Sequence, residues 1–218
     1  DNAIDISLTA DEYDGDSYSF AIITDVSNGT SSLNGTVITY TPNQDWNGTD
    51  TFTFEATDDR TARRNVATAT ITVNAINDTP TSSEVSGSSD EDTAIDITLS
   101  ATDVDQDNLT YSIVSDVSNG TTNISGSTLT YTPNQDWNGT DTFTYKVNDG
   151  TVDSNTSNGT ITIAAVNDAP VANDVTISTN ETRFISVDFP LDATDIDGDN
   201  LTYTIVSDAS NATTSLSG

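Results

Sequence analysis

Residues 127–146 read STLTYTPNQDWNGTDTFTYK, and residues 36–55 read TVITYTPNQDWNGTDTFTFE. In both copies apolar and polar residues alternate on either side of a central turn-forming stretch, Pro-Asn-Gln-Asp-Trp-Asn-Gly. Alternation with a period of two residues predicts strands that are buried on one face, and Pro-Asn and Asn-Gly are turn formers. The stretch therefore predicts strand, turn, strand, and it occurs twice.

The duplication extends along the whole chain with a period near 90 residues. Trp46 and Trp137 are 91 residues apart, and Pro80 and Pro170 are 90 apart. This period is the size of a whole small domain and too long for one unit of a solenoid. We therefore expect a first repeat over 1–78 that lacks its opening strand, a complete second repeat over 79–168, and the first half of a third over 169–218.

Further alternating segments fill each repeat, and none has helical periodicity. They are rich in Ile, Val, Tyr, Phe and Thr, which favour strands. Examples begin at Ile4, Tyr18, Ile95 and Leu109. About seven short strands in 90 residues are typical of an immunoglobulin-type β-sandwich. The predicted fold is all-β, with tandem cadherin-like or Ig-like sandwiches in a linear array. In the third repeat, the half sandwich would leave residues such as Tyr203 without an opposite sheet.

The composition excludes several kinds of chemistry. The chain has 35 acidic and 5 basic residues, no His and no Cys, and a net charge of −30. Nucleic acid is a poor partner because phosphate binding needs Lys and Arg. Disulfides and thiolate zinc sites are excluded, and the commonest general base is missing. Carboxylate and carbonyl oxygens remain, and these suit hard cations such as calcium.

The sequence contains neither a signal peptide nor an apolar run long enough to span a membrane. It begins inside a repeat without an initiator Met. We therefore expect it to be a section of a longer polypeptide.

The acidic residues that are best placed to bind a cation lie in short loops. Asp103, Asp105 and Asp107 place three carboxylates in five residues, where they repel one another unless a cation is bound. Calcium takes six to eight oxygen ligands. Asn77 and Asp78 in the preceding linker and Asp149 after a later strand should converge on this loop. A second set at the next junction comprises Asn167, Asp168, Asp195, Asp197 and Asp199, and the matching loop of the first repeat offers Glu12, Asp14, Asp16 and Asp58.

These motifs carry a family resemblance. The order A-T-D-x-D-x-D-N-L-T-Y, then Y-T-P-N-x-D-x-N-G-T-D-T-F, then V-N-D-A-P resembles the cadherin-like tandem repeats of very large bacterial surface adhesins. The resemblance covers essentially the whole chain. It implies a β-sandwich with calcium near the linker between successive domains, and by analogy it adds Glu91 and Asp136 to the second site. Gln106 departs from the pattern, because the other two repeats have Gly15 and Gly198 there.

Other features have two interpretations. Trp46 and Trp137 can stack on sugar rings, which predicts a carbohydrate-binding module, or pack at the base of each sandwich. Asn-x-Ser/Thr sequons are numerous, but most read as Asn-Gly turns.

The acidic loops do not have the glycine and glutamate of an EF-hand. Paired carboxylates recur in every repeat at turn positions, which does not favour an active site, and we expect no enzyme.

The sequence therefore predicts an extracellular, calcium-stiffened segment of a large bacterial or archaeal cell-surface adhesin or biofilm protein, acting as a stalk. Its expected partners are calcium and neighbouring repeats, with other copies of the chain or surface glycans as further candidates. Two alternatives stay open at this point. One is a carbohydrate-binding surface module, and the other is the protomer of a filament joined by strand exchange between incomplete end domains.

Overall fold

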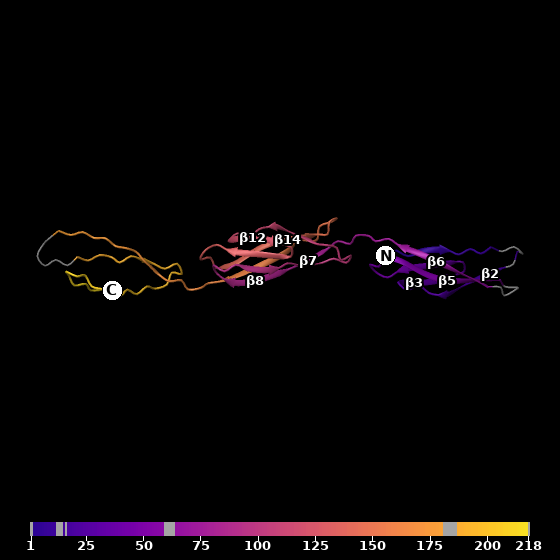
Figure 1. Cartoon of the computed structure of the whole chain (residues 1–218), viewed down its shortest axis with the longest axis horizontal. Coiled ribbons are helices and arrows are strands. Elements are labelled where there is room, and N and C mark those ends of the chain that lie inside the picture. Colours follow the sequence, from indigo (N-terminus) through magenta and orange to yellow (C-terminus); the bar gives the residue numbers. More distant parts are fainter. Residues whose placement is uncertain (1, 12–14, 16, 59–63, 181–186, 218) are drawn as a thin grey trace. The chain divides into compact units, whose positions relative to one another are not determined.

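The structure is a computed structural model of the 218-residue chain, and it describes residues 2–11, 15, 17–58, 64–180 and 187–217. The chain forms two compact units. The first contains residues 1–82, 101–110 and 147–155, and the second contains 83–100, 111–146 and 156–218. All regular elements in the described ranges are strands, drawn as arrows in Figure 1, which confirms the predicted all-β class.

The first repeat forms two three-stranded sheets, ordered β1-β4-β3 and β2-β5-β6. Its strands are β1 (Ile4–Ser7), β2 (Tyr18–Thr24), β3 (Gly29–Asn34), β4 (Val37–Pro42), β5 (Gly48–Asp58) and β6 (Arg64–Val73). The core joins the inward residues of both sheets, with Ile38, Tyr40 and Phe52 almost completely buried. The quoted motif supplies β4, the turn and β5, so it builds one strand of each sheet.

The second repeat has the same plan with more strands. These are β7 (Thr81–Ser83), β8 (Val85–Asp90), β9 (Ile95–Thr98), β10 (Ser100–Thr102), β11 (Thr110–Ser115), β12 (Gly120–Ser125), β13 (Thr128–Pro133), β14 (Gly139–Asn148) and β15 (Ser157–Ala164). One sheet has the order β11-β14-β15-β8, a second has the order β12-β13-β9, and β10 pairs with β7. Along β15 buried and exposed residues alternate without exception, as expected for a strand with one face on the core.

A buried carboxylate holds a loop in each sandwich. Asp141 is 4% exposed and accepts hydrogen bonds from the backbone N–H groups of Ser118, Asn119 and Thr142. The Tyr131 hydroxyl lies 3.4 Å from it, and burial together with this nearby carboxylate raises the pKa of Tyr131 to about 12. The hydrogen bonds offset the cost of burying the charge.

Asp50 repeats this arrangement in the first repeat and is 3% exposed. Burial alone would raise its pKa. The N–H groups of Ser27, Asn28 and Thr51 and the Tyr40 hydroxyl outweigh that effect and bring the pKa below its ordinary value. The Asp of N-G-T-D-T-F is therefore a structural residue in both copies.

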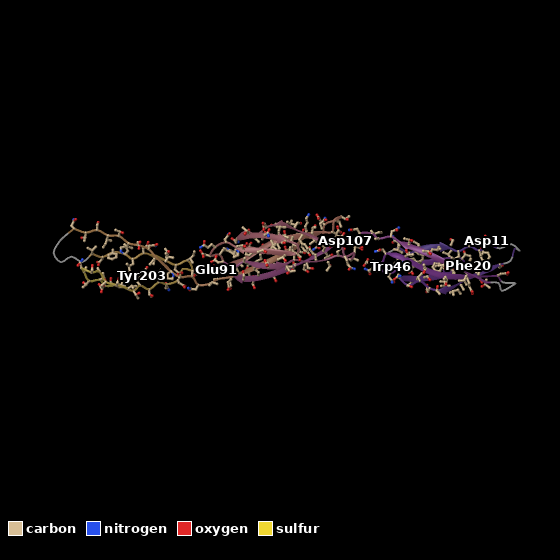
Figure 2. The ribbon with its side chains drawn as sticks, in the orientation of Figure 1. Asp11, Phe20, Trp46, Glu91, Asp107 and Tyr203 are labelled. Atoms are coloured by element: carbon tan, nitrogen blue, oxygen red, sulfur yellow. The ribbon has the colours of Figure 1, made fainter. Side chains whose placement is uncertain are left out.

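In the third segment the described residues contain two short strands, β16 (Val171–Ala172) and β17 (Ala193–Thr194), which pair with each other. The alternating run around Tyr203, labelled in Figure 2, forms no strand, and Tyr203 and Ile205 are 41% and 42% exposed. Leu109, Tyr111 and Ile113 of the second repeat lie at or within β11, which pairs with β14. Among the described residues of 169–217, no strand takes the place that β14 has beside β11, and the run around Tyr203 pairs with no sheet.

Candidate calcium centres

The first candidate centre is the loop that follows β10. Carboxylate oxygens of Asp103, Asp105 and Asp107 lie within 4.8 Å of one another. The loop closes on itself, because the backbone N–H of Asp107 donates to Oδ1 of Asp103 at 3.1 Å. Gln106 takes the turn with φ at 62°, the left-handed conformation that Gly15 and Gly198 adopt at the equivalent positions. The side chain therefore does not prevent the loop from forming, although glycine adopts this conformation with less strain.

One carboxylate oxygen of this loop lacks a hydrogen-bond partner. Oδ2 of Asp103 is buried and has no hydrogen-bond partner among the described residues. A buried carboxylate oxygen without a partner is costly, unlike the satisfied oxygens of Asp141. A cation bound by Asp103, Asp105 and Asp107 would coordinate this oxygen and remove the repulsion between the three carboxylates. The residues therefore fit a hard cation.

The linker residues predicted for this centre do lie against the loops of the second repeat. The backbone N–H of Asp78 donates to Oδ2 of Asp105 at 2.7 Å. The Asn77 side-chain amide donates to Oδ2 of Asp149 at 2.8 Å, and this bond is the main cause that lowers the pKa of Asp149. All six residues predicted from sequence for this centre belong to the first compact unit.

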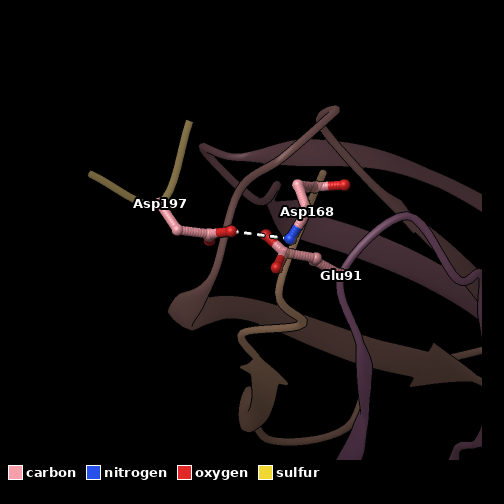
Figure 3. Close-up of side chains that lie close together, drawn as sticks. All are labelled: Glu91, Asp168 and Asp197. Carbon is pink, nitrogen blue, oxygen red and sulfur yellow. Dashed lines mark hydrogen bonds between the residues drawn. The ribbon is translucent and has the colours of Figure 1, made fainter. Parts of the chain in front are cut away.

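The second candidate centre joins three segments of the second unit. Figure 3 shows Glu91, Asp168 and Asp197 converging, and their carboxylate oxygens lie within 4.8 Å of one another. The backbone N–H of Asp168 donates to Oδ2 of Asp197 at 2.7 Å, matching the bond between Asp78 and Asp105. Glu91 is 5% exposed and accepts a hydrogen bond from the backbone N–H of Val166. Glu91, which the family resemblance implied, thus lies beside the linker residue Asp168.

The second centre is strongly acidic. The pKa of Asp168 is raised, first by desolvation and then by the charges of Asp136, Asp197, Glu91 and Asp92. Asp136 was predicted for this centre, and its backbone N–H donates to Oδ1 of Asp92. Asp92 was not predicted. The sequence signal available was its place in the acidic run Asp90-Glu91-Asp92. In the structure Asp92 has a positive φ of 59°, which marks a turn.

The remaining residues that were predicted as metal ligands lie in different places. Asn167 donates from its side-chain amide to the Asp168 carbonyl, and Oδ1 of Asp195 accepts the N–H groups of Asp197 and Asp199. These residues are therefore close to the second centre. Asp58 is the last residue of β5. Glu12, Asp14 and Asp16 fall outside the described residues.

The two tryptophans have equivalent positions. A Cβ placed on Gly48 would lie 3.1 Å from the Trp46 ring, and one on Gly139 would lie 3.2 Å from the Trp137 ring. Each ring therefore lies over the glycine two residues on and is half-buried there. Trp46 also lines a cavity of about 150 Å³ together with Asp78 and Asp105, next to the first centre.

Comparison with known proteins decides the family. The sequence matches the bacterial Ig domain over residues 1–74, 77–163 and 167–218. The chain belongs to the bacterial Ig domain family. A search of curated protein sequences gave no significant match.

Solved structures of cadherin domains have the same fold as this bacterial Ig chain. The crystal structure of human CDH23 EC21-23 has a TM-score of 0.64 at 18% identity, covering 87% of this chain and 77% of that one. The structure of protocadherin gamma B2 extracellular cadherin domains 1-5 has a TM-score of 0.50 at 18% identity, covering 80% and 39%. These similarities confirm the cadherin-like, Ig-like sandwich.

A third structure is an endo-fucoidan hydrolase of glycoside hydrolase family 107. It has a TM-score of 0.36 at 20% identity and covers 76% of this chain, which spans 26% of the enzyme. So low a score carries no argument about activity. In the described part of the chain, no helix is both long and apolar enough to cross a bilayer.

Proposed function

We propose that this segment is part of the stalk of an extracellular bacterial adhesin, in which calcium bound beside each linker stiffens a row of Ig domains. The observation that carries the proposal is the orphaned Oδ2 of Asp103 inside a cluster of three carboxylates. Bacterial Ig and cadherin-like domains are usually extracellular, and millimolar calcium is available to weak sites there.

Calcium would act on the linkers through the residues that already meet there. Asp103, Asp105 and Asp107 supply carboxylates from one loop, while Asp78 and Asn77 belong to the linker that hydrogen-bonds to it. At the second centre Glu91 and Asp197 flank the linker residue Asp168. A cation shared by a linker and the loops beside it restricts the linker's backbone, and this restriction is the proposed stiffening.

The size of the effect follows from linkage. A ligand that binds only the ordered junction stabilises it by about 2.7 kcal/mol at a concentration one hundredfold above its dissociation constant. Without calcium, the clustered carboxylates repel, and a net charge of −30 adds long-range repulsion. We therefore expect an ordered row of domains with calcium and a loosely connected one without it.

The first test of the proposal is isothermal titration calorimetry, in which calcium is titrated into the whole chain. Saturable binding that is weakened by Asp105→Asn and by Asp168→Asn would support it. Binding that is unchanged in both variants would overturn it. Asp96→Asn is the matched control, because Asp96 is an exposed carboxylate on β9 that belongs to neither centre.

The carbohydrate-binding alternative has a separate test. Each Trp ring is half-buried over a glycine, a position that also serves packing. Glycan binding that is lost in Trp137→Ala, with the fold retained, would favour that alternative over the stalk.

A further inference from the structure

The chain contains six Asn-Gly dipeptides, whose asparagines are Asn28, Asn34, Asn47, Asn119, Asn138 and Asn158. Asparagine is a thermolabile residue, and a following glycine makes it more so, because glycine has no side chain to hinder attack by its own backbone nitrogen. The attack also needs a peptide nitrogen without a hydrogen bond and a backbone that can rotate. The surroundings of each dipeptide therefore decide which asparagine loses its amide in the folded chain.

The first dipeptide of each complete sandwich is held by a buried carboxylate. The backbone N–H of Asn28 donates to Oδ2 of Asp50 at 2.8 Å, and its carbonyl accepts the N–H of Asn43 at 2.9 Å. Asn119 is held in the same way in the second repeat. A residue whose N–H and carbonyl are both fixed cannot rotate into the geometry that the attack requires.

Strand pairing restrains a third asparagine. Asn158 lies within β15, and the glycine that follows it, Gly159, faces Phe143 of β14 on one side and Val85 of β8 on the other. The attacking nitrogen would have to leave a sheet that is paired along both edges. Asn158 should therefore keep its amide while the sheet is intact.

The two asparagines beside the tryptophans are restrained by strands and rings together. Gly48 follows Asn47 and begins β5, and Gly139 follows Asn138 and begins β14. Each glycine faces a partner residue in the next strand and lies against the ring of the Trp two residues before it. Both dipeptides are therefore less free to rotate than an open turn.

Asn34 and Gly35 lie at the tip of the β3–β4 hairpin. Asn34 ends β3 and faces Val37, so Gly35 and Thr36 form a two-residue loop. Residues 34–36 are exposed, and a Cβ built on Gly35, whose φ is 63°, would have no atom within 4 Å. Within the part of the chain that the structure describes, neither the Gly35 N–H nor the Asn34 side chain takes part in a hydrogen bond. The attacking nitrogen and its target are both free.

We propose that Asn34 is a site of spontaneous deamidation in the folded chain. The Gly35 nitrogen, once deprotonated, forms a bond to Cγ of Asn34, and the side-chain nitrogen leaves as ammonia. Water then opens the cyclic succinimide at either carbonyl, which leaves aspartate or isoaspartate in place of the asparagine. The net reaction consumes water and releases ammonia, and it needs no oxidant, reductant or enzyme.

Isoaspartate in this turn would act on the sheet beside it. It adds a carbon atom to the main chain of the loop, and the length of a hairpin loop fixes the register of its strands. The next pair along the ladder joins Leu33 to Ile38, which is fully buried in the first core. The carbonyl of Thr36 also accepts the N–H of Leu8 at 2.8 Å. The modification therefore loosens the β1-β4-β3 sheet as the protein ages.

The second repeat provides a matched turn without the reactive amide. Ser125 and Gly126 occupy the equivalent positions, Ser125 faces Thr128, and Gly126 has φ at 61°. Serine cannot form the succinimide, so the second repeat lacks the site. The substitution Ser125→Asn should create it, because the turn geometry is already present.

Peptide mapping of the whole chain tests the proposal. The folded chain is incubated in warm, mildly alkaline buffer, which favours the deprotonated nitrogen, and is digested with a protease that cleaves before aspartate. Cleavage before Asp25 and Asp45 releases residues 25–44, so tandem mass spectrometry compares Asn28 and Asn34 within one peptide. Asn34 should deamidate about tenfold faster than Asn28, and in urea, which removes local protection, the two rates should become similar.

Two results would overturn the proposal. One is equal deamidation of Asn28 and Asn34 in the folded chain, and the other is earlier loss of the amide at Asn47 or Asn138. Circular dichroism during the incubation checks that the sandwiches remain folded, so that slow unfolding is not mistaken for reaction in the native turn.

Transplanting the site tests whether the turn is the cause. Ser125→Asn should add a second fast deamidation within residues 116–135, while Asn119 in the same peptide stays slow. Asn34→Ser should remove the fast reaction from the first repeat. If the asparagine introduced by Ser125→Asn reacts no faster than Asn119, the turn geometry does not determine the rate and the proposal is wrong.

Hydrogen exchange tests the structural consequence separately. Chain that contains isoaspartate is isolated after incubation by ion-exchange chromatography and compared with fresh chain and with Asn34→Asp, which has the added charge but a normal main chain. Amides of residues 29–42 should exchange faster in the isoaspartate form than in Asn34→Asp. Identical exchange in the two would contradict the loosening of the sheet. None of these measurements depends on calcium.

Discussion

Asn77 and Asp149 are 72 residues apart in sequence, and the side-chain amide of Asn77 donates a 2.8 Å hydrogen bond to Oδ2 of Asp149. One residue belongs to the linker, and the other belongs to the loop after β14. The bond favours the ionised carboxylate, so the pKa of Asp149 is lowered. An ionised Asp149 close to Asp78 and its partner Asp105 is the state that a calcium ion requires.

Replacing the orphaned carboxylate should weaken cation binding at the first centre. We expect Asp103→Asn to raise the calcium dissociation constant of that centre about tenfold or more, since it removes one charged ligand from a set of three. Isothermal titration calorimetry measures the change. An unaltered binding isotherm would show that Asp103 is not a ligand, and Asp96→Asn gives the baseline for losing one remote charge.

The buried carboxylates should be essential to the sandwiches. Asp141→Asn replaces an acceptor oxygen by an NH2 group that faces backbone N–H donors. Hydrogen bonds to charged groups contribute about 1.5–3 kcal/mol each, so we expect roughly 3 kcal/mol of lost stability. Urea denaturation followed by Trp fluorescence measures it. Asp116→Asn, at an exposed position, should change the unfolding free energy by about 0.5 kcal/mol or less, and a similar loss in both variants would refute this role.

Acid should unfold the first repeat through Asp50. Folding lowers the pKa of Asp50, so its contribution is fully present above the ordinary Asp value near 4. That contribution is lost as pH falls through the lower folded value. Thermal denaturation between pH 2 and pH 5 should show a decline that is shallower in Asp50→Asn. Parallel pH profiles for the two proteins would contradict the assignment.

Tyr145 should stabilise the second repeat through its hydroxyl. The hydroxyl lies 2.9 Å from the Ser100 carbonyl, accepts the Ser100 N–H at 3.2 Å, and also contacts the Ser83 carbonyl. Tyr145→Phe should cost about 0.5–1.5 kcal/mol, since the part-buried backbone groups of Ser83 in β7 and Ser100 in β10 lose a hydrogen-bond partner. The first repeat has Phe54 at this position, and Phe54→Tyr should not raise the free energy of unfolding of the first repeat by a comparable amount. Denaturation of both variants tests the contrast.

The all-β class, the strands and the cluster of carboxylates in the loop after β10 were predictable because they are local. Alternating residues determine which face of β15 is buried, and Asp103, Asp105 and Asp107 are close in sequence. The buried state of Asp141 was not predictable, because Asp in an N-G-T-D turn usually reads as solvated. Asp92 was missed for a related reason: its position beside Asp136 depends on pairing between segments 44 residues apart. The resemblance, and not the spacing, pointed to Glu91.

The central claim is that calcium orders the linkers, and small-angle X-ray scattering of the whole chain tests it most directly. Profiles are recorded in millimolar calcium and again after chelation, at an ionic strength that screens the net charge. The account predicts a well-defined maximum dimension with calcium and a broader distribution without it, and Asp105→Asn and Asp168→Asn should resemble the chelated state. Superimposable profiles with and without calcium would contradict the account.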